Sequence, residues 1–134
     1  MNIFENCKNS KIQGNIGLGA AIKYFSALGC VVSLPLNDSQ DYDLIIDDGD
    51  SLHKVQVRTT NYITKIGNYV VNLRVLGGNS KSNYVHKTAN QIIYDILFVL
   101  CGNGDAYVIP KKDIQHLSNA LTLCKQYRRF KVEL

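Results

Sequence analysis

Three polar residues of the sequence, a carboxylate, an amide and a guanidinium, are spaced so that a local hairpin could bring them together, although such triplets also occur by chance in many domains. Asp43, Gln56 and Arg58 belong to two neighbouring segments, 42–47 and 52–58, which an Asp-Gly-Asp turn separates. Each segment is typical of a β-strand, and the turn between them is typical of a tight hairpin. A carboxylate and an amide oxygen are ligands for a hard divalent cation, and a guanidinium binds phosphate. The hairpin is therefore a candidate catalytic element.

The hairpin places these three side chains on one face in either of its two possible registers. A Gly49-Asp50 loop sets Asp43 opposite Gln56, and an Asp48-Gly49 loop sets it opposite Lys54. One face then carries Asp43, Ile45, Asp47, Lys54, Gln56 and Arg58, and the other carries Leu44, Ile46, His53, Val55 and Val57. We expect the second face to be the core, with His53 half-buried and hydrogen-bonded. The alternative without any chemistry is an exposed Asp43–Lys54 pair and an ordinary surface Arg58.

The rest of the chain predicts an α+β fold with a mixed β-sheet. A broad apolar side over residues 14–28 predicts a helix, with Asn15 as its N-cap and Gly29 just past its end. Further strands are expected at 30–34, 69–75, 96–100, 106–109 and 121–123, short helices at 87–94 and 110–117, and a loop at 77–84. The unbroken apolar run from Ile96 to Leu100 predicts a strand that is covered on both faces.

Composition limits the class of protein. The 134 residues suit a single domain spanning 1–134, and 46% apolar against 19% charged residues excludes a disordered chain. No apolar run approaches the roughly 18 residues of a membrane helix, so no membrane association is expected. The four cysteines lack CxxC pairing, which argues against zinc, and they suit a reduced, cytoplasmic protein.

Charge is segregated along the chain. Six of the acidic residues are aspartates between Asp38 and Asp50, and residues 51–94 contain no acid. The bases of that acid-free stretch are Lys54, Arg58, Lys65, Arg74, Lys81 and Lys87. This layout suits a polyanion-binding enzyme with a metal site, although chance scatter of surface charge is the simpler alternative.

The sequence around the hairpin resembles the PD-(D/E)XK nuclease superfamily. It is most similar to the intron-associated branch of that superfamily, which contains a homing endonuclease. The elements that carry the resemblance are Gly14 to Gly17, Gly29, Pro35, Tyr42-Asp43-Leu44 and Val55 to Thr59. Two later segments, 94–100 and 107–110, resemble the closing strands of the same fold. The resemblance implies a restriction-endonuclease-like core, α/β/α-like, with a mixed sheet flanked by helices.

The resemblance also implies a site for Mg²⁺ (or Mn²⁺) that hydrolyses the phosphodiester bonds of DNA. Asp43 would be the central metal ligand, and Gln56 a second ligand through its amide oxygen or through a metal-bound water. The carbonyl of Val57 would supply a further oxygen. Arg58 stands at the motif position that contacts the scissile phosphate or the nucleophile.

The sequence departs from the family pattern at two positions. Arg58 replaces the usual Lys, and a permanently protonated guanidinium cannot act as a general base, although it can clamp a phosphate. Many relatives carry a Glu early in the first helix, where this chain has residues 18–21 without an acid; Glu5 and Asp41 are the possible replacements. Two alternatives follow: a catalytically degenerate DNA-binding module of the same fold, or a structure-selective nuclease like a junction resolvase. A third is an interaction protein with no nucleic-acid role.

The resemblance implies double-stranded DNA as the partner, and the acid-free stretch is the candidate contact surface. The candidate contact residues are Lys54, Lys65, Asn72, Arg74, Lys81 and Lys87. They belong mostly to a hairpin-like segment over 60–75 and the loop that follows it to residue 84, and the alternative is a polar hairpin that happens to lack acids. Because one subunit holds one site, cutting both strands predicts a homo-oligomer, a dimer or a tetramer.

Overall fold

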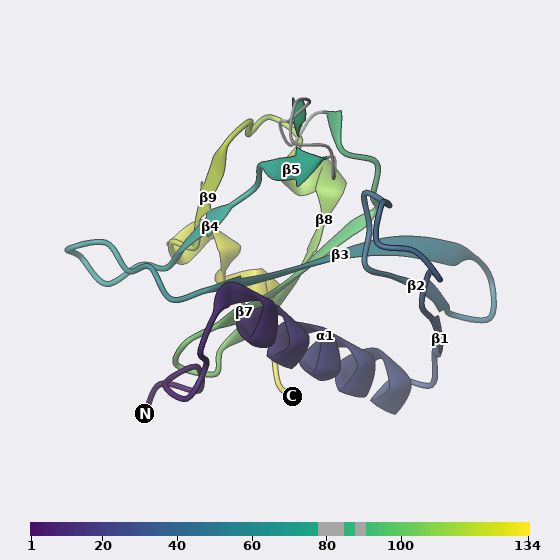
Figure 1. Ribbon diagram of the computed structural model, residues 1–134, viewed down its shortest axis with the longest axis horizontal. Coiled ribbons are helices and arrows are strands. Elements are labelled where there is room, and N and C mark those ends of the chain that lie inside the picture. Colours follow the sequence, from purple (N-terminus) through teal and green to yellow (C-terminus); the bar gives the residue numbers. More distant parts are fainter. Residues whose placement is uncertain (78–84, 88–90) are drawn as a thin grey trace.

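The computed structural model describes residues 1–77, 85–87 and 91–134, and its centre is a six-stranded mixed sheet (Figure 1). In spatial order its strands are β1 (Val31–Ser33), β2 (Leu44–Asp47), β3 (Leu52–Thr60), β7 (Ile96–Cys101), β8 (Ala106–Pro110) and β10 (Lys131–Val132). The pair β3–β7 is parallel and every other pair of this sheet is antiparallel. The predicted α+β class with a mixed sheet is confirmed.

Strand β7 lies in the middle of the sheet and is covered on both faces. Its residues from Leu97 to Cys101 are all buried, as the continuous apolar run predicts. Alternate side chains contribute to two separate cores, Phe98 and Leu100 on one face and Leu97 and Val99 on the other. Its parallel partner β3 carries the motif, so the motif strand pairs with a strand that is buried along nearly its whole length.

One long helix, α1 (Ser10–Ala27), packs on the first face of the sheet (Figure 1). It begins four residues before the predicted start, because Asn9 rather than Asn15 is the N-cap and its side chain accepts a hydrogen bond from Ile12 N. The expectation for Asn15 was therefore wrong. Gly29 follows the helix with φ of 90°, a conformation that glycine adopts freely, as predicted.

The hairpin formed by β2 and β3 supplies the core beneath α1. Its register pairs Leu44 with Val55 and Ile46 with His53, which corresponds to the Gly49-Asp50 loop. The helix contributes three buried residues to this core, and the hairpin contributes four. They are Gly17, Ala21 and Phe25 of α1 and Leu44, Ile46, Val55 and Val57 of the hairpin. The predicted core face is thus confirmed, with His53 half-buried at the turn, where its ring contacts Asp48 and Ser51.

A second layer covers the other face. It consists of the two-stranded sheet of β4 (Val70–Asn72) and β9 (Ala120–Thr122), the 3-10 helix η3 (Lys125–Phe130) and their neighbouring segments. Gln56 is 5% exposed on this side, so the part of the hairpin's polar face around Gln56 is enclosed rather than open to solvent. The helix predicted for 110–117 is a single 3-10 turn, η2 (Lys111–Asp113), which ends at Ile114, where φ is −130°.

The strand predicted for 69–75 is divided into β4 and a separate strand, β5 (Val75–Gly77), which pairs with β6 (Val85–Lys87). Lys87 therefore belongs to a strand and does not begin a helix. The predicted loop over 77–84 lies, from residue 78 on, outside the described residues. Within the described part of the chain no helix is long and apolar enough to cross a membrane.

Candidate active site

Asp43 and the motif strand β3 are joined directly by hydrogen bonds. Asp43 Oδ2 accepts one bond from the backbone N–H of Val57 at 2.7 Å and another from Gln56 Nε2 at 3.1 Å. The backbone N–H of Asp43 in turn donates to Val55 O at 2.9 Å. Three hydrogen bonds therefore hold Asp43 against the strand, and the two that its carboxylate accepts both use Oδ2.

The end of strand β2 explains why this arrangement forms. β2 begins at Leu44, which pairs with Val55, so β3 continues past its neighbour and the backbone of Val57 has no strand partner on that side. An unpaired N–H at a buried edge is costly, and the Asp43 carboxylate satisfies it. The hydrogen bond is charge-assisted, which makes it stronger than one between neutral groups.

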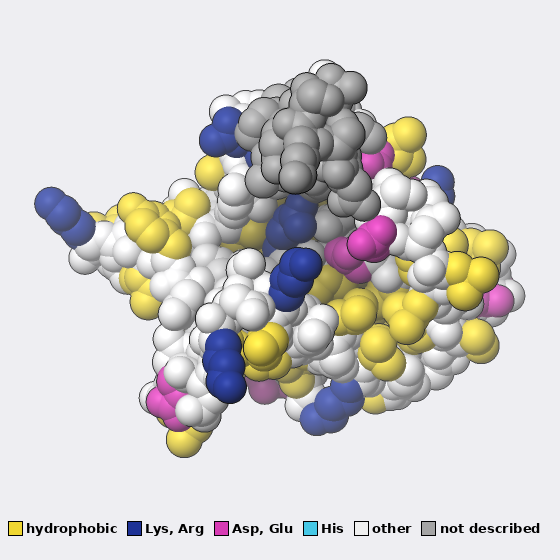
Figure 2. Space-filling view, in the orientation of Figure 1, with side chains coloured by type: hydrophobic (Ala, Val, Ile, Leu, Met, Phe, Trp, Pro, Cys, Tyr) yellow, Lys and Arg dark blue, Asp and Glu magenta, His cyan; other side chains and the backbone are white. Residues whose placement is uncertain are grey.

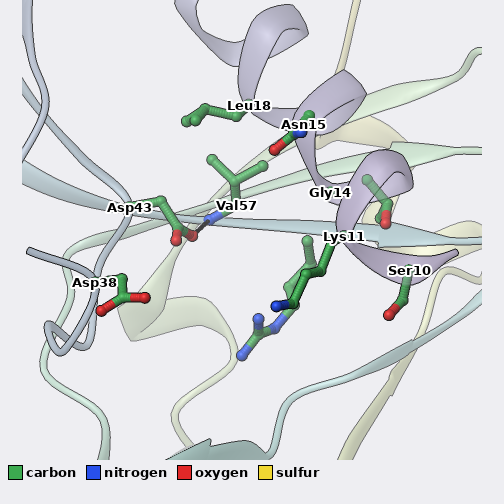
Figure 3. Close-up of a pocket in the computed structure, with 10 residues that line it drawn as sticks. Ser10, Lys11, Gly14, Asn15, Leu18, Asp38, Asp43 and Val57 are labelled. Carbon is green, nitrogen blue, oxygen red and sulfur yellow. Dashed lines mark hydrogen bonds between the residues drawn. The ribbon is translucent and has the colours of Figure 1, made fainter.

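A cavity of about 670 Å³ opens beside this edge (Figure 3). It is lined by Ser10, Lys11, Gly14, Asn15 and Leu18 of α1, Asp38 of the β1–β2 connection, Asp43, and Val57, Arg58 and Thr59 of β3. Gln56 is absent from this lining, because it is buried behind Asp43. The structure thus brings the three predicted residues together, with Asp43 and Arg58 on the cavity wall and Gln56 supporting Asp43.

The charged groups of the cavity divide into two sides. Asp38 and Asp43 lie close together, while Lys11 reaches in from the first turn of α1 (Figure 3). Arg58 is the other base of the lining. Figure 2 shows the same separation on the molecular surface, where basic side chains border one side of the hollow above α1 and acidic side chains the other. A site of this polarity suits a cation and an anion held next to each other.

Burial shifts the pKa values of the two motif residues in opposite directions. It raises the pKa of Asp43 above the ordinary 3.8, against the backbone N–H of Val57 and the positive charge of Arg58, which lower it. Burial also lowers the pKa of Arg58, against Asp43 and Tyr94, which raise it. Asp43 opposes this lowering of the Arg58 pKa, because its negative charge favours the protonated guanidinium.

The donor set for a divalent ion is small. Among the described residues there is no cluster of three or more His, Cys, Asp or Glu side chains that could hold a metal. The second carboxylate of the cavity is Asp38, which is not among the residues predicted from the sequence. Asp38 belongs to the aspartate-rich segment, but nothing in its local pattern distinguishes it from Asp41, Asp47 or Asp50. Asp38 lines the cavity because of the way the β1–β2 connection folds.

The two acids considered as replacements for a helix Glu do not line the cavity. Glu5 is exposed in the segment before α1. Asp41 accepts a hydrogen bond from Ile93 N at 3.1 Å and lines a smaller, separate pocket that also includes Lys54. Neither residue therefore joins Asp43.

The predicted DNA-contact residues are spread over several elements. Lys54 lies over the ring of Tyr42 at 5.4 Å, at the smaller pocket. Lys65 is exposed in the turn between β3 and β4, and Asn72 and Arg74 are exposed at and just after β4, where Asn72 Oδ1 accepts from Arg74 N at 2.9 Å. Lys87 is placed by its backbone in β6, and Lys81 lies outside the described residues.

The connection between β3 and β4 projects from the body of the molecule, at the left of Figure 1. It is a short ribbon, closed by the bridge Ile63–Tyr69 and by a turn in which Thr64 N donates to Asn68 O at 2.8 Å. Two of its apolar side chains are largely exposed, Tyr62 at 68% and Ile66 at 85%, beside Lys65. An exposed ribbon with this composition is suited to contact with another macromolecule.

Comparison with known proteins identifies the class to which this fold and site belong. Residues 8–131 match the family model of the PD-(D/E)XK endonucleases, so the chain belongs to that family and the predicted resemblance is confirmed. Comparison with curated protein sequences gives no match.

The chain is also similar to a solved structure, the bacterial homing endonuclease I-Ssp6803I. The two share 28% sequence identity with a TM-score of 0.72, over 90% of this chain and 82% of the other. The likeness therefore includes most of both proteins and supports the homing-endonuclease-like branch.

Proposed function

We propose that the protein is a metal-dependent DNA endonuclease of the homing or mobile-element kind. The observation that carries this proposal is the position of Asp43, bonded to the edge of β3 and facing the same cavity as Arg58. Membership of the PD-(D/E)XK endonuclease family and the likeness to a homing endonuclease support it. Its four cysteines are free, which agrees with a cytoplasmic location.

The residues present fit a divalent ion such as Mg²⁺ or Mn²⁺ with few protein ligands. Asp43 would hold it through Oδ1, Asp38 faces the same cavity, and the carbonyl of Val57 points to the same side of β3 as its N–H. Magnesium commonly keeps several waters, so a small oxygen donor set suffices. The bound ion would polarise the phosphate and lower the pKa of an attacking water.

Gln56 acts in this arrangement by positioning Asp43. Its amide nitrogen donates to Asp43 Oδ2, so the amide oxygen, which is the possible metal ligand, points elsewhere. Direct ligation by Gln56 would require the amide to rotate and would set two acceptor oxygens together. The role we propose for Gln56 is to keep the Asp43 carboxylate in its orientation.

Arg58 would bind the phosphate that is cut. Its guanidinium carries a positive charge within the electrostatic field of Asp43 and stands on the cavity wall. A guanidinium donates two parallel hydrogen bonds to phosphate oxygens and stabilises charge that develops on them in the transition state. We assign no general-base role to it.

DNA would lie across the cavity and the ribbon between β3 and β4. Lys65, Asn72 and Arg74 are exposed on or near this ribbon and can contact the phosphates and base edges of a duplex. Because the described part of one chain provides a single set of motif residues, cutting both strands requires a second copy, and we propose a dimer or a tetramer.

Incubation of supercoiled plasmid with the protein and Mg²⁺ or Mn²⁺ tests the proposal. We expect nicked and linear DNA that requires the metal and disappears in the Asp43→Asn variant. Substrates should include a plasmid library, a four-way junction and a flap, since preference for a junction would identify a structure-selective nuclease.

The second candidate is a DNA-binding module of the same fold that has lost catalysis. The small donor set favours it, since the described residues provide two cavity carboxylates and no helix Glu. It predicts salt-sensitive DNA binding by wild type without cleavage in either metal. Cleavage that depends on Asp43 would exclude it, and absence of both binding and cleavage would exclude both candidates.

A further inference from the structure

Helix α1 brings a second base to the cavity, at a position that no motif indicates. Lys11, Gly14, Asn15 and Leu18 line the cavity, and their spacing of three and four residues places them along one stripe of the helix. A different stripe, Gly17, Ala21 and Phe25, is buried against the sheet. Lys11 is thus on the side of the helix that faces the site, and its side chain extends into the cavity (Figure 3).

The helix turn that carries Lys11 is held firmly against β3. Asn9 caps the helix two residues before Lys11, and Gln13 Nε2 donates to Thr59 Oγ1 at 2.9 Å two residues after it. Thr59 directly follows Arg58 in the strand. The lysine and the arginine are therefore presented by two elements that are hydrogen-bonded to each other at this point.

The charge of Lys11 is not neutralised within the described part of the chain. The ion pairs found there join His53 to Asp48, Arg129 to Asp113 and Lys131 to Asp105, all away from the cavity. Lys11 is itself exposed, and Gly14 beside it adds no side chain that could cover the ammonium. An ammonium that has no carboxylate partner among the described residues, in a cavity that Arg58 also lines, is suited to an anion.

We propose that Lys11 binds the scissile phosphate together with Arg58 and so supplies the lysine contact that the motif position lacks. This inference rests on the proposed nuclease function. A phosphodiester has two non-bridging oxygens, and a guanidinium and an ammonium from opposite elements can each bind one, while the carboxylates occupy the other side of the cavity. The ammonium of Lys11 is a compact charge that donates single hydrogen bonds, whereas the planar guanidinium of Arg58 can donate two parallel ones.

The test compares Lys11→Ala and Lys11→Arg with Lys23→Ala as the matched control. Lys23 is an exposed lysine on the same helix, twelve residues later, and does not line the cavity. For each variant we would measure the single-turnover cleavage rate at saturating DNA in Mg²⁺, and the affinity for the same duplex without metal over a series of salt concentrations. Thermal unfolding would confirm that all variants fold.

We expect Lys11→Ala to reduce the cleavage rate at least about tenfold and to reduce the slope of log affinity against log salt by about 0.9, the effect of one lost phosphate contact. Lys11→Arg should keep the salt slope, and Lys23→Ala should cut DNA within about twofold of wild type. Equal behaviour of Lys11→Ala and Lys23→Ala in both measurements would overturn the inference. A wild type that cuts no DNA would sink the nuclease proposal, and the salt slope would then decide whether Lys11 binds phosphate.

Discussion

Gly17 of helix α1 and Thr59 of strand β3 approach so closely that a Cβ atom at position 17 would lie 2.5 Å from Thr59 Cγ2. Real Cβ atoms do not tolerate that distance, so glycine is required where the helix crosses the strand. The same crossing sets how far the cavity stripe of α1 lies from the motif strand. The close crossing at Gly17 therefore lies beside Thr59, which lines the candidate active site.

Replacing this glycine should lower the stability of the protein. We expect Gly17→Ala to lower the free energy of unfolding by about 1–3 kcal/mol, because the added methyl must push the helix away from Thr59 or Val57. Gly19→Ala is the matched control: its Cβ would meet nothing within 4 Å, and alanine favours a helix by about 1 kcal/mol over glycine. Chemical denaturation measures both, and a Gly17→Ala protein as stable as Gly19→Ala would contradict the close crossing.

Asp43→Asn should abolish cleavage and leave the protein at least as stable. The ionised carboxylate is disfavoured by burial, and an asparagine Oδ1 in the same place can accept both bonds from Val57 N and Gln56 Nε2. Loss of the charged metal ligand should reduce the cleavage rate by at least about a hundredfold.

The pH dependence of this variant gives a second check. The pKa of Asp43 in the folded protein lies above 3.8, so folding favours the protonated carboxyl. Wild type therefore loses stability as the pH rises from 3.8 through this raised pKa. The asparagine of the variant does not titrate, so the variant does not lose this stability. The advantage of Asp43→Asn should therefore be present at neutral pH and disappear as the pH falls toward 3.8. Denaturation curves over this range measure it, and a variant that is less stable than wild type at neutral pH would contradict the argument.

Asp38→Asn should weaken metal binding. Asp38 is the carboxylate that shares the cavity with Asp43, and removing its charge leaves a single acid there. We expect affinity for Mn²⁺, measured by calorimetry or by electron paramagnetic resonance, to fall at least about tenfold, the size of effect that follows loss of a supporting group at a metal site. Asp50→Asn, in the exposed hairpin turn, is the control and should bind the ion like wild type.

Lys65→Ala should weaken binding to specific and unrelated DNA duplexes by the same factor. The residue is exposed on the projecting ribbon, so loss of one phosphate contact should reduce the salt slope of binding by about 0.9 and leave the unfolding transition unchanged. Lys112→Ala, at an exposed lysine of η2, provides the comparison. Filter binding on specific and unrelated duplexes would measure both, and identical slopes for the two variants would remove the ribbon from the DNA surface.

The hairpin turn should contribute stability that depends on pH. Backbone N–H groups of Ser51 and Asp50, with the ring of His53, lower the pKa of Asp48 to about 2. A lowered pKa means that the contribution is complete above pH 3.8 and is lost as the pH falls toward 2. Asp48→Asn should therefore be less stable than Asp50→Asn at neutral pH, and the gap should narrow on acidification. A gap that does not change with pH would contradict the assignment.

Local geometry was sufficient to predict the hairpin and its two faces. Side chains alternate along a strand and a short turn limits the register, so the grouping of Asp43, Gln56 and Arg58 follows from their spacing in the chain. The apolar run of β7 likewise predicts its burial. The helix start was misplaced because two asparagines, Asn9 and Asn15, could each serve as the cap, and the choice between them depends on packing.

The sequence by itself therefore determined the motif hairpin, the α+β class and the family. The tertiary structure decided the rest of the site: Gln56 is enclosed under the second layer, and Asp38 and Lys11 join the cavity from two different elements. Asp38 stands among several aspartates and Lys11 is one lysine among many, so neither is marked by its neighbours in sequence. Asp38 and Lys11 reach the cavity only because the β1–β2 connection and helix α1 pack against β3. Such packing depends on contacts throughout the core and not on the residues next to them in the sequence.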